Sequence, residues 1–577
     1  RRPDEVPSTA PVRGAPLYDD PALPATRADE TPAAPHPELP DPFALMPWVD
    51  SFEPIALDPS APARSPFRPL PLEKPKDVEV IAARSEAERL LRSRNVTSGD
   101  QARQAMQLLV QVPDDQRARV IDGLDQRSFE NLIDRIPDSE KEQFAKLVES
   151  SQDPKRKLKL WAAMHVARAN NDLDKYKGDF GSDDDRTDEQ DEAKARYDRR
   201  SAGVASTKQE VDAEVARMLA KDKEGKLTLA DVDDLRARKD LELNIEMKYN
   251  VNLVAETTAR GDGSQVMWTK EELADTDATL ARLPPSQVSG PKGVPTFIRR
   301  ANRGITTKGG EYLGDHIDIY DNAHRQGPET ENVDTFAHAV THEIGHDVAA
   351  DHHKAFEKFE KAAGWETVDD TRLAKEHVSS DKVAWLDRRR RRAQDESEVN
   401  LDITQDGKLY QPTDVKGKYY EVPVTAFPNK EEWRYGKTNP GEQFAEMYAK
   451  AVDEPQTIYN DFVAAPQQNA KQARAKAAQD QAAVKNAPSG SDADALRARA
   501  AESERAATEA ERVAQQRDDE FSIMRNDVFH TDKAVAAAKE RLRQAHAKPA
   551  EIAAFEARAA QVSTPEQVAE LERQVKK

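Results

Sequence analysis

The sequence predicts an α+β domain of about 220 residues between mainly α-helical regions, preceded by a proline-rich disordered segment, residues 1–77. Nineteen of the 36 prolines lie between Pro3 and Pro75, and proline fixes φ and removes a hydrogen-bond donor, which favours an extended chain. After about residue 240, strand-like alternation is interleaved with helical periodicity, as in α+β domains. Beyond about residue 465, alanine and charged residues predominate, which predicts exposed helices or a loose coiled coil.

Composition excludes several classes of function. The chain has 577 residues, a formal net charge of −20 and no cysteine, so disulfides, cysteine-based zinc sites and thiol nucleophiles are excluded. The acidic balance argues against nucleic acid as a partner. Charged residues make up 33% of the chain, which is too polar for one core over its whole length. No apolar run is long enough for a transmembrane segment.

A short internal repeat predicts a helical domain over residues 78–180. The segment from Leu108 to Asp114 recurs 24 residues later, from Leu132 to Asp138. Each copy contains a proline followed by acidic residues and a helical apolar pattern (Val120 and Leu124, then Phe144 and Val148), which marks a helix start. We therefore expect stacked antiparallel helix pairs with no chemistry of their own.

Residues 181–240 are predicted to be an acidic linker, about 183–192, followed by a helix over about 207–221. The α+β domain follows at 241–465, and an alanine- and charge-rich helical tail occupies 466–577. The elements expected in the α+β domain are a strand near 249–253, a helix capped by Thr269 and Glu272, a strand at 316–320, one long helix over about 334–363, hairpins over 398–425 with turns at Asp406-Gly407 and Lys416-Gly417, and a helix over about 440–453.

One pentapeptide has the composition of a metal site: His342-Glu343-Ile344-Gly345-His346. Residues four apart on a helix differ by about 40° in direction, so both imidazoles point the same way. Two imidazole nitrogens so placed can bind one Zn²⁺, and Glu343 is suited to accept a proton from water. An apolar stripe supports the helix: Phe336, Val340, Ile344 and Val348.

A catalytic zinc ion needs a third protein ligand and an open position. His338 precedes His342 by one turn, but three histidines along one helix would spread over about 12 Å, too far for one ion. His352 follows His346 by six residues. On an unbroken helix it would lie about 240° away from His346, and Ala349 between them favours the helix.

The third candidate for that ligand is Glu442, which follows Pro440 at the start of a predicted helix. Glu446 lies one turn later on the same face, so one carboxylate can bind zinc while the other accepts a hydrogen bond from a ligating histidine. Three residues are thus candidates for the third ligand: His338 and His352, which an unbroken helix disfavours, and Glu442.

The segment from Tyr435 to Glu446, YGKTNPGEQFAE, resembles the one that carries the third zinc ligand in anthrax lethal factor-type metallopeptidases. The pentapeptide, with its glycine, is similar to theirs too. This resemblance covers about residues 245–465 and implies a zincin-like fold of the gluzincin type. It implies these roles: His342, His346 and Glu442 as ligands of one zinc ion, Glu343 as general base, Tyr435 as donor to the oxyanion, and Glu446 as a support behind the ligands.

The function implied is that of a zinc metalloendopeptidase, a hydrolase of protein or peptide substrates, within a secreted or injected bacterial toxin or effector. We expect such a protein to be cytoplasmic before export and then secreted or delivered into a target cell, with a secretion or injection apparatus as a partner. The strand at 317–320 is expected to be the sheet edge on which an extended substrate adds a strand.

Two features depart from the family pattern. Residues 377–430, with the run Arg388–Arg392, look like an insertion, and no counterpart of the cell-entry domain of lethal factor is evident. Two other interpretations therefore stand beside the peptidase. One is a degenerate peptidase fold that serves as a structural or loading protein of a secretion apparatus, and the other is a protease that cuts its own linkers.

Overall fold

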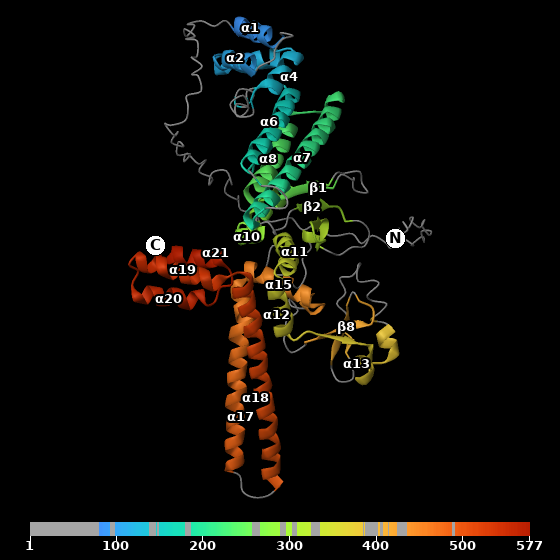
Figure 1. Ribbon diagram of the computed structural model, residues 1–577, viewed down its shortest axis with the longest axis vertical. Coiled ribbons are helices and arrows are strands. Elements are labelled where there is room, and N and C mark those ends of the chain that lie inside the picture. The colour runs from blue at the N-terminus through green and yellow to red at the C-terminus, as the bar shows by residue number, and fades with distance from the viewer. Residues whose placement is uncertain are drawn as a thin grey trace, which may run out of the picture. The chain divides into compact units, whose positions relative to one another are not determined.

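The computed structural model describes residues 80–92, 99–137, 146, 149, 151–178, 180, 186–256, 266–288, 296–302, 309–324, 335–384, 386, 402–403, 408–413, 415–423, 435–486 and 491–576. The chain divides into two units, Arg1–Pro75 and Lys76–Lys577, and every described residue belongs to the second. The expectations for the proline-rich segment, for Arg388–Arg392 and for the turn at Asp406-Gly407 lie outside the described residues. The described part is mostly helical with small sheets (Figure 1), and none of its helices is long and apolar enough to cross a membrane.

The helical repeat forms a small cluster of its own. Its apolar positions, including Leu109, Val120, Leu124 and Leu132, are buried in one core. Phe144 and Val148, from the second copy of the repeat, lie outside the residues whose side chains are described. The described helices of this cluster are α1 (Val80–Arg92), α2 (Gly99–Val110), α3 (Asp114–Gly123) and α4 (Gln126–Arg135).

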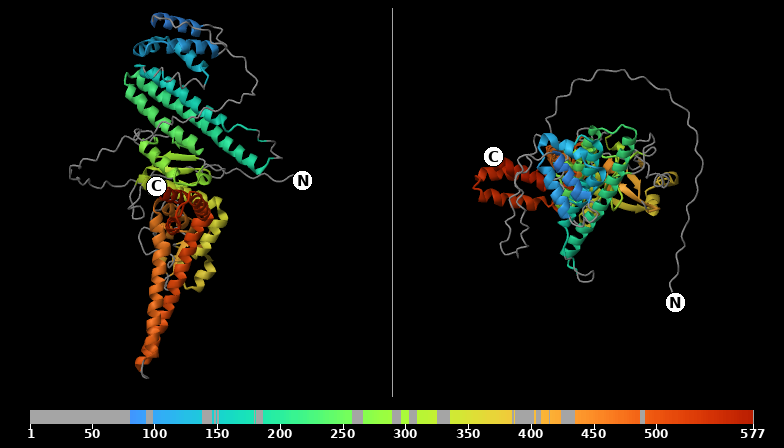
Figure 2. Two further views of the ribbon diagram at one scale, coloured as in Figure 1. Left: turned by 90° about the vertical axis from the view of Figure 1, so that its left-hand side faces the viewer. Right: turned by 90° about the horizontal axis from the view of Figure 1, so that it is seen from above.

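Three long helices follow, α6 (Pro154–Asp174), α7 (Asp188–Lys223) and α8 (Leu229–Tyr249), and they pack side by side (Figure 2). The expectation of a linker to about residue 192 and a helix from 207 was wrong, because α7 already begins at Asp188. Thr187 and Gln190 cap its first turn reciprocally. Of the acidic residues that indicated a linker, Asp188, Glu189 and Asp191 lie in the first turn of this helix, where the helix dipole favours negative charge, and Asp183–Asp185 lie outside the described residues.

The first sheet has the strand order β1-β2-β4-β3, with β1 (Asn252–Ala255), β2 (Thr296–Arg300) and β4 (Ile317–Tyr320) parallel and β3 (Gly310–Tyr312) antiparallel to β4. The expectation that the strand at 317–320, β4, is the sheet edge was wrong. The chain preceding β4 folds back along it as β3, so β3 and not β4 is the outer strand on that side of the described sheet. The helix capped by Thr269 and Glu272 is confirmed as α9 (Lys270–Leu280).

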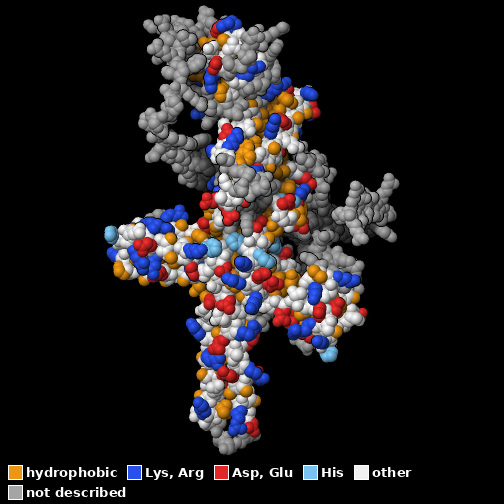
Figure 3. Space-filling model, viewed as in Figure 1, with side chains coloured by type: hydrophobic (Ala, Val, Ile, Leu, Met, Phe, Trp, Pro, Cys, Tyr) orange, Lys and Arg blue, Asp and Glu red, His pale blue; other side chains and the backbone are white. Residues whose placement is uncertain are grey.

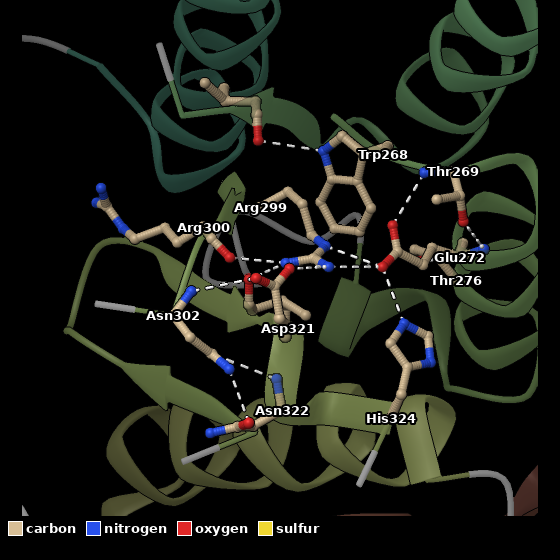
Figure 4. Close-up of polar contacts among 12 residues, drawn as sticks. Trp268, Thr269, Glu272, Thr276, Arg299, Arg300, Asn302, Asp321, Asn322 and His324 are labelled. Atoms are coloured by element: carbon tan, nitrogen blue, oxygen red, sulfur yellow. Dashed lines mark hydrogen bonds and ion pairs between the residues drawn. The ribbon is translucent and has the colours of Figure 1, made fainter. Parts of the chain in front are cut away.

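An ionic cluster around the buried side chains of Arg299 and Glu272 lies at the carboxyl ends of the parallel strands and joins α9, the sheet and the next turn (Figure 4). The Arg299 guanidinium lies 2.9 Å from a Glu272 carboxylate oxygen and 2.8 Å from an Asp321 oxygen. His324, in the same turn as Asp321 (η1, Asp321–His324), lies 2.9 Å from Glu272 and stacks on Phe336 at 5.0 Å. Phe336 stands in the first turn of α11 (Thr335–Asp351), so this contact joins the cluster to that helix.

The long helix expected over 334–363 is broken. α11 ends at Asp351, His352 has non-helical angles (φ −98°, ψ 45°), and α12 (His353–Ala363) then starts in a new direction. The change of direction lets Phe359 pack edge-to-face on Phe444 of α15 (Pro440–Asp453), with ring centroids 5.2 Å apart. The apolar stripe of α11 is fully buried, as expected, and the helix predicted at 440–453 is confirmed.

The second sheet has the order β5-β8-β7-β6. Its turn at Lys416-Gly417 is confirmed, with Gly417 at φ +75°. The strands are β5 (Glu366–Asp369), β6 (Asp402–Ile403), β7 (Leu409–Pro412) and β8 (Lys418–Val422). The shorter elements of the domain are α10 (Pro285–Val288), α13 (Asp370–Lys375), η6 (Tyr435–Lys437), α16 (Pro455–Tyr459) and η7 (Asn460–Ala464).

The C-terminal region is helical, as predicted. Helices α17 (Ala465–Lys485) and α18 (Ser491–Ile523) form a hairpin on which basic and acidic side chains intermingle (Figure 3). Alanines spaced by seven residues make its seam (Ala470 and Ala477 on one helix; Ala493, Ala500, Ala507 and Ala514 on the other). After a turn at η8 (Met524–Val528), three helices pack on one another: α19 (Thr531–Gln544), α20 (Pro549–Ala559) and α21 (Pro565–Lys576).

The core of the α+β domain extends past residue 465. The end of α18, the π-helical segment η8 and the residue after it contribute large apolar side chains that are buried with residues of α11 and α15. They are Phe521, Met524, Val528 and Phe529.

Candidate metal centre

The centre forms where α11 and α15 pack in opposite directions. Gly345 makes the close approach feasible, because a Cβ there would lie 2.9 Å from Ala445 Cα and 3.2 Å from Tyr448 Cβ. His342 and His346 on one helix therefore face Glu442 and Glu446 on the other.

Three ligand atoms converge at the solvent end of this interface. Glu442 Oε2 lies 3.0 Å from His342 Nε2 and 3.2 Å from His346 Nε2, and the three atoms lie within 4.8 Å of one another. Ligands bound tetrahedrally to Zn²⁺ at about 2.0–2.2 Å are about 3.3 Å apart. The donor set and its spacing therefore fit one zinc ion.

The start of α15 positions the third ligand. Asn439 caps the helix by accepting a hydrogen bond from the Glu442 backbone N–H at 2.9 Å, and Pro440 occupies the first turn. Although burial alone would raise the pKa of Glu442, His346 and His342 hold it well below its usual value. The side chains of Glu442 and His346 are 18% and 21% exposed, so solvent reaches this side, as a catalytic metal requires.

Glu343 lies beneath the edge strand β3. Its Oε2 accepts a hydrogen bond from the Tyr312 backbone N–H at 2.8 Å. Gly310 gives it room, because a Cβ at Gly310 would lie 2.6 Å from Glu343 Cγ. Burial raises the pKa of this carboxyl group, while His342 and His346 oppose the shift. A carboxylate with a raised pKa beside two imidazoles that could bind a metal ion is suited to accept and return a proton.

Glu446 lies behind the ligands. Its Oε1 is 3.2 Å from His342 Nδ1 and 3.4 Å from His338 Nε2, and all three side chains are buried. These residues form the second group, among those described, that could hold a metal ion. A carboxylate that faces Nδ1 of His342 would help to direct its Nε2 toward a metal ion held by the first group.

The other predicted residues are placed as follows. The backbone of Tyr435 begins η6, just before α15, but its side chain lies outside the described residues. His352 lies between α11 and α12 and belongs to neither group of converging ligands among the described residues. Helix spacing disfavoured His338 as a ligand, and no other role was predicted for it. Its position four residues before His342 was the signal that it shares the buried face of the helix.

No protein-family model matches the chain, and comparisons with curated proteins and with solved structures find no match. The chemistry of the site therefore rests on the geometry and charge of its own residues.

Proposed function

We propose that this chain is a zinc-dependent endopeptidase of the gluzincin type. The observation that carries the proposal is the convergence of His342 Nε2, His346 Nε2 and Glu442 Oε2 within 4.8 Å of one another, next to Glu343 on the same helix as the two histidines. Three protein ligands and an adjacent general base are the groups that peptide hydrolysis assisted by one metal ion requires of the protein.

Zinc, when bound, supplies a Lewis acid that polarises a peptide carbonyl and acidifies water. His342, His346 and Glu442 would hold it. Glu343 accepts the proton from the attacking water and passes it to the leaving amine. Tyr435, which the chain places directly before the α15 cap, is proposed to donate a hydrogen bond to the developing oxyanion.

The position of β3 as an outer strand of the described sheet supports a mode of substrate binding. Tyr312 on this strand is tied to Glu343 through its backbone N–H, so an extended peptide added to β3 would lie next to the general base. We propose β3, instead of β4, as the strand that pairs with substrate. The modular layout also leads us to propose that the domain acts within a bacterial toxin or effector that is cytoplasmic before export and is then secreted or delivered into a target cell.

Zinc content and cleavage together test the function. We expect about one zinc ion per chain in the wild type, retained with cleavage abolished in Glu343→Gln, and lost in Glu442→Ala. His352→Ala is the control and should keep both zinc and activity. If Glu343→Gln cleaves peptides at the wild-type rate, the mechanism is wrong. If the wild type binds no zinc even after it is added back, the degenerate-fold interpretation replaces the enzyme.

A further inference from the structure

A line of charged side chains continues from the proposed ligands along the α11–α15 interface. His338 Nε2 lies 3.4 Å from Glu446 Oε1, and its other ring nitrogen lies 3.5 Å from Asp453 Oδ2. Asp453 Oδ1 in turn lies 2.9 Å from the Arg282 guanidinium, which is 40% exposed. The line thus runs from the surface, through Asp453 and His338, to the carboxylate that contacts His342.

The spacing along both helices produces this line. His338, His342 and His346 are four residues apart on α11, so each turn of that helix presents one imidazole to α15. Because α15 runs in the opposite direction, Asp453 in its last turn meets His338, and Glu446 lies between His338 and His342.

We propose that His338 is a positioning residue of the metal centre, with Asp453 as its support; this inference rests on the proposed function. Carboxylates lie near both ring nitrogens of His338, although only the contact to Glu446 has hydrogen-bond geometry. Two negative charges beside one buried ring favour the positively charged imidazolium. The imidazolium fixes Glu446 Oε1, which lies 3.2 Å from His342 Nδ1. Glu446 then holds the ring of His342 with Nε2 directed at the metal.

The same atoms could instead hold a second metal ion. The number of ligands argues against that use, because a closed structural zinc site takes four protein ligands and only three ligand atoms converge here among the described residues. His342 would also have to bind one metal through each nitrogen. Glu446 acts more simply as an acceptor shared by two histidines.

Zinc affinity, measured by competition with a chromogenic chelator, tests the proposal on the full chain. We compare the wild type with His338→Phe, His338→Gln and Asp453→Asn. The matched control is His165→Phe, which removes an equally buried histidine that lies 3.0 Å from Asp240 in the long-helix region. The unfolding temperature of each metal-free protein and the visible spectrum of its cobalt-substituted form are recorded as well.

We expect His338→Phe to weaken zinc binding by about 10- to 100-fold and to alter the cobalt spectrum, with a smaller loss in Asp453→Asn. His338→Gln keeps a donor for Glu446 and should restore part of the affinity. His165→Phe should lower the unfolding temperature but leave zinc affinity unchanged.

Wild-type affinity and an unchanged cobalt spectrum in both His338→Phe and Asp453→Asn would overturn the proposal while leaving the proposed function intact. If His338→Phe does not fold, Asp453→Asn alone decides. Two zinc ions in the wild type, one of them lost in His338→Phe, would make His338 a ligand and overturn it too. Absence of zinc from the wild type would overturn the proposed function itself.

Discussion

Gly345 and Ala445 meet where α11 packs on α15, and a methyl group on Gly345 would lie 2.9 Å from the Ala445 Cα. This contact sets the distance between the helix that carries the two histidines and the helix that carries Glu442. Because the obstructing atom is backbone, a side chain at Gly345 can be accommodated only if the two helices move apart.

Gly345→Ala should therefore destabilise the fold by about 1–3 kcal/mol, the usual cost of an added methyl group in a close-packed core, and should weaken zinc binding by separating the ligands. Urea unfolding and zinc titration measure the two effects. Gly178→Ala is the control, since a Cβ there would lie no closer than 3.6 Å to Phe180. Normal zinc affinity in Gly345→Ala would show that the contact does not set the ligand geometry.

Gly310→Ala should reduce peptide cleavage without removing zinc. The added Cβ would lie 2.6 Å from Glu343 Cγ and 2.9 Å from its Oε1, so the general base must move. Displacing a reacting group by about 1 Å can cost roughly 100-fold in rate. kcat and zinc content are measured together. Gly309→Ala serves as control, because a Cβ at Gly309 would lie 3.3 Å from Ala323 Cα, its nearest neighbour. Equal kcat for both variants would contradict this placement of Glu343.

Local chemistry made much of the site predictable from the sequence. The four-residue spacing of His342 and His346 needs only a helix to bring them together, and Asn439-Pro440 marks the helix start that carries Glu442. The identity of the edge strand could not be predicted, because pairing between β3 and β4 depends on tertiary contacts and only three residues of β3 take part.

In the fold, too, features with a local sequence signal were predicted and features that depend on tertiary contacts were not. The cap formed by Thr269 and Glu272 is a local signal and it was found. The break at His352 has no such signal, since Ala349 favours helix and the new direction comes from the packing of Phe359 on Phe444. The domain boundary near 465 was drawn from composition, which does not reveal that a few distant apolar residues complete the core.

Truncation after residue 465 should unfold the α+β domain that carries the candidate metal centre. Removal of an exposed tail would leave that domain folded. Gln443, next to Glu442, donates to Glu520 at 2.9 Å and accepts from Trp365 at 2.6 Å, and four large apolar side chains of the C-terminal region share the same core. At about 1.5–3 kcal/mol for each buried side chain, their loss is comparable with the whole stability of a typical domain.

Circular dichroism and limited proteolysis of the truncated chain measure this effect. The matched control replaces residues 478–500, the distal part of the α17–α18 hairpin, with a short glycine-serine loop and keeps the buried base. We expect the control to unfold at nearly the wild-type temperature. A truncated chain that stays folded and binds zinc would mean that the C-terminal region is dispensable to the core.

Glu246 should make stability depend on pH. This residue of α8 is buried, accepts a hydrogen bond from the Leu253 backbone N–H at 2.9 Å, and lies 3.7 Å from Arg200. Burial raises its pKa to about 7, although Arg200 and the hydrogen bond oppose the shift. Between the unfolded value of 4.5 and about 7, the native state therefore holds a proton that the unfolded state has released.

Because the native state binds more protons in that window, the free energy of unfolding falls as pH rises from 4.5 to 7 and the loss is complete above it. Glu246→Gln keeps an acceptor for Leu253 but cannot ionise, so it should gain stability relative to the wild type as pH rises, by about 1–3 kcal/mol at pH 8. Denaturant unfolding of both proteins at pH 5 and pH 8 measures this gain. If the difference between them is the same at both pH values, Glu246 does not titrate in this window.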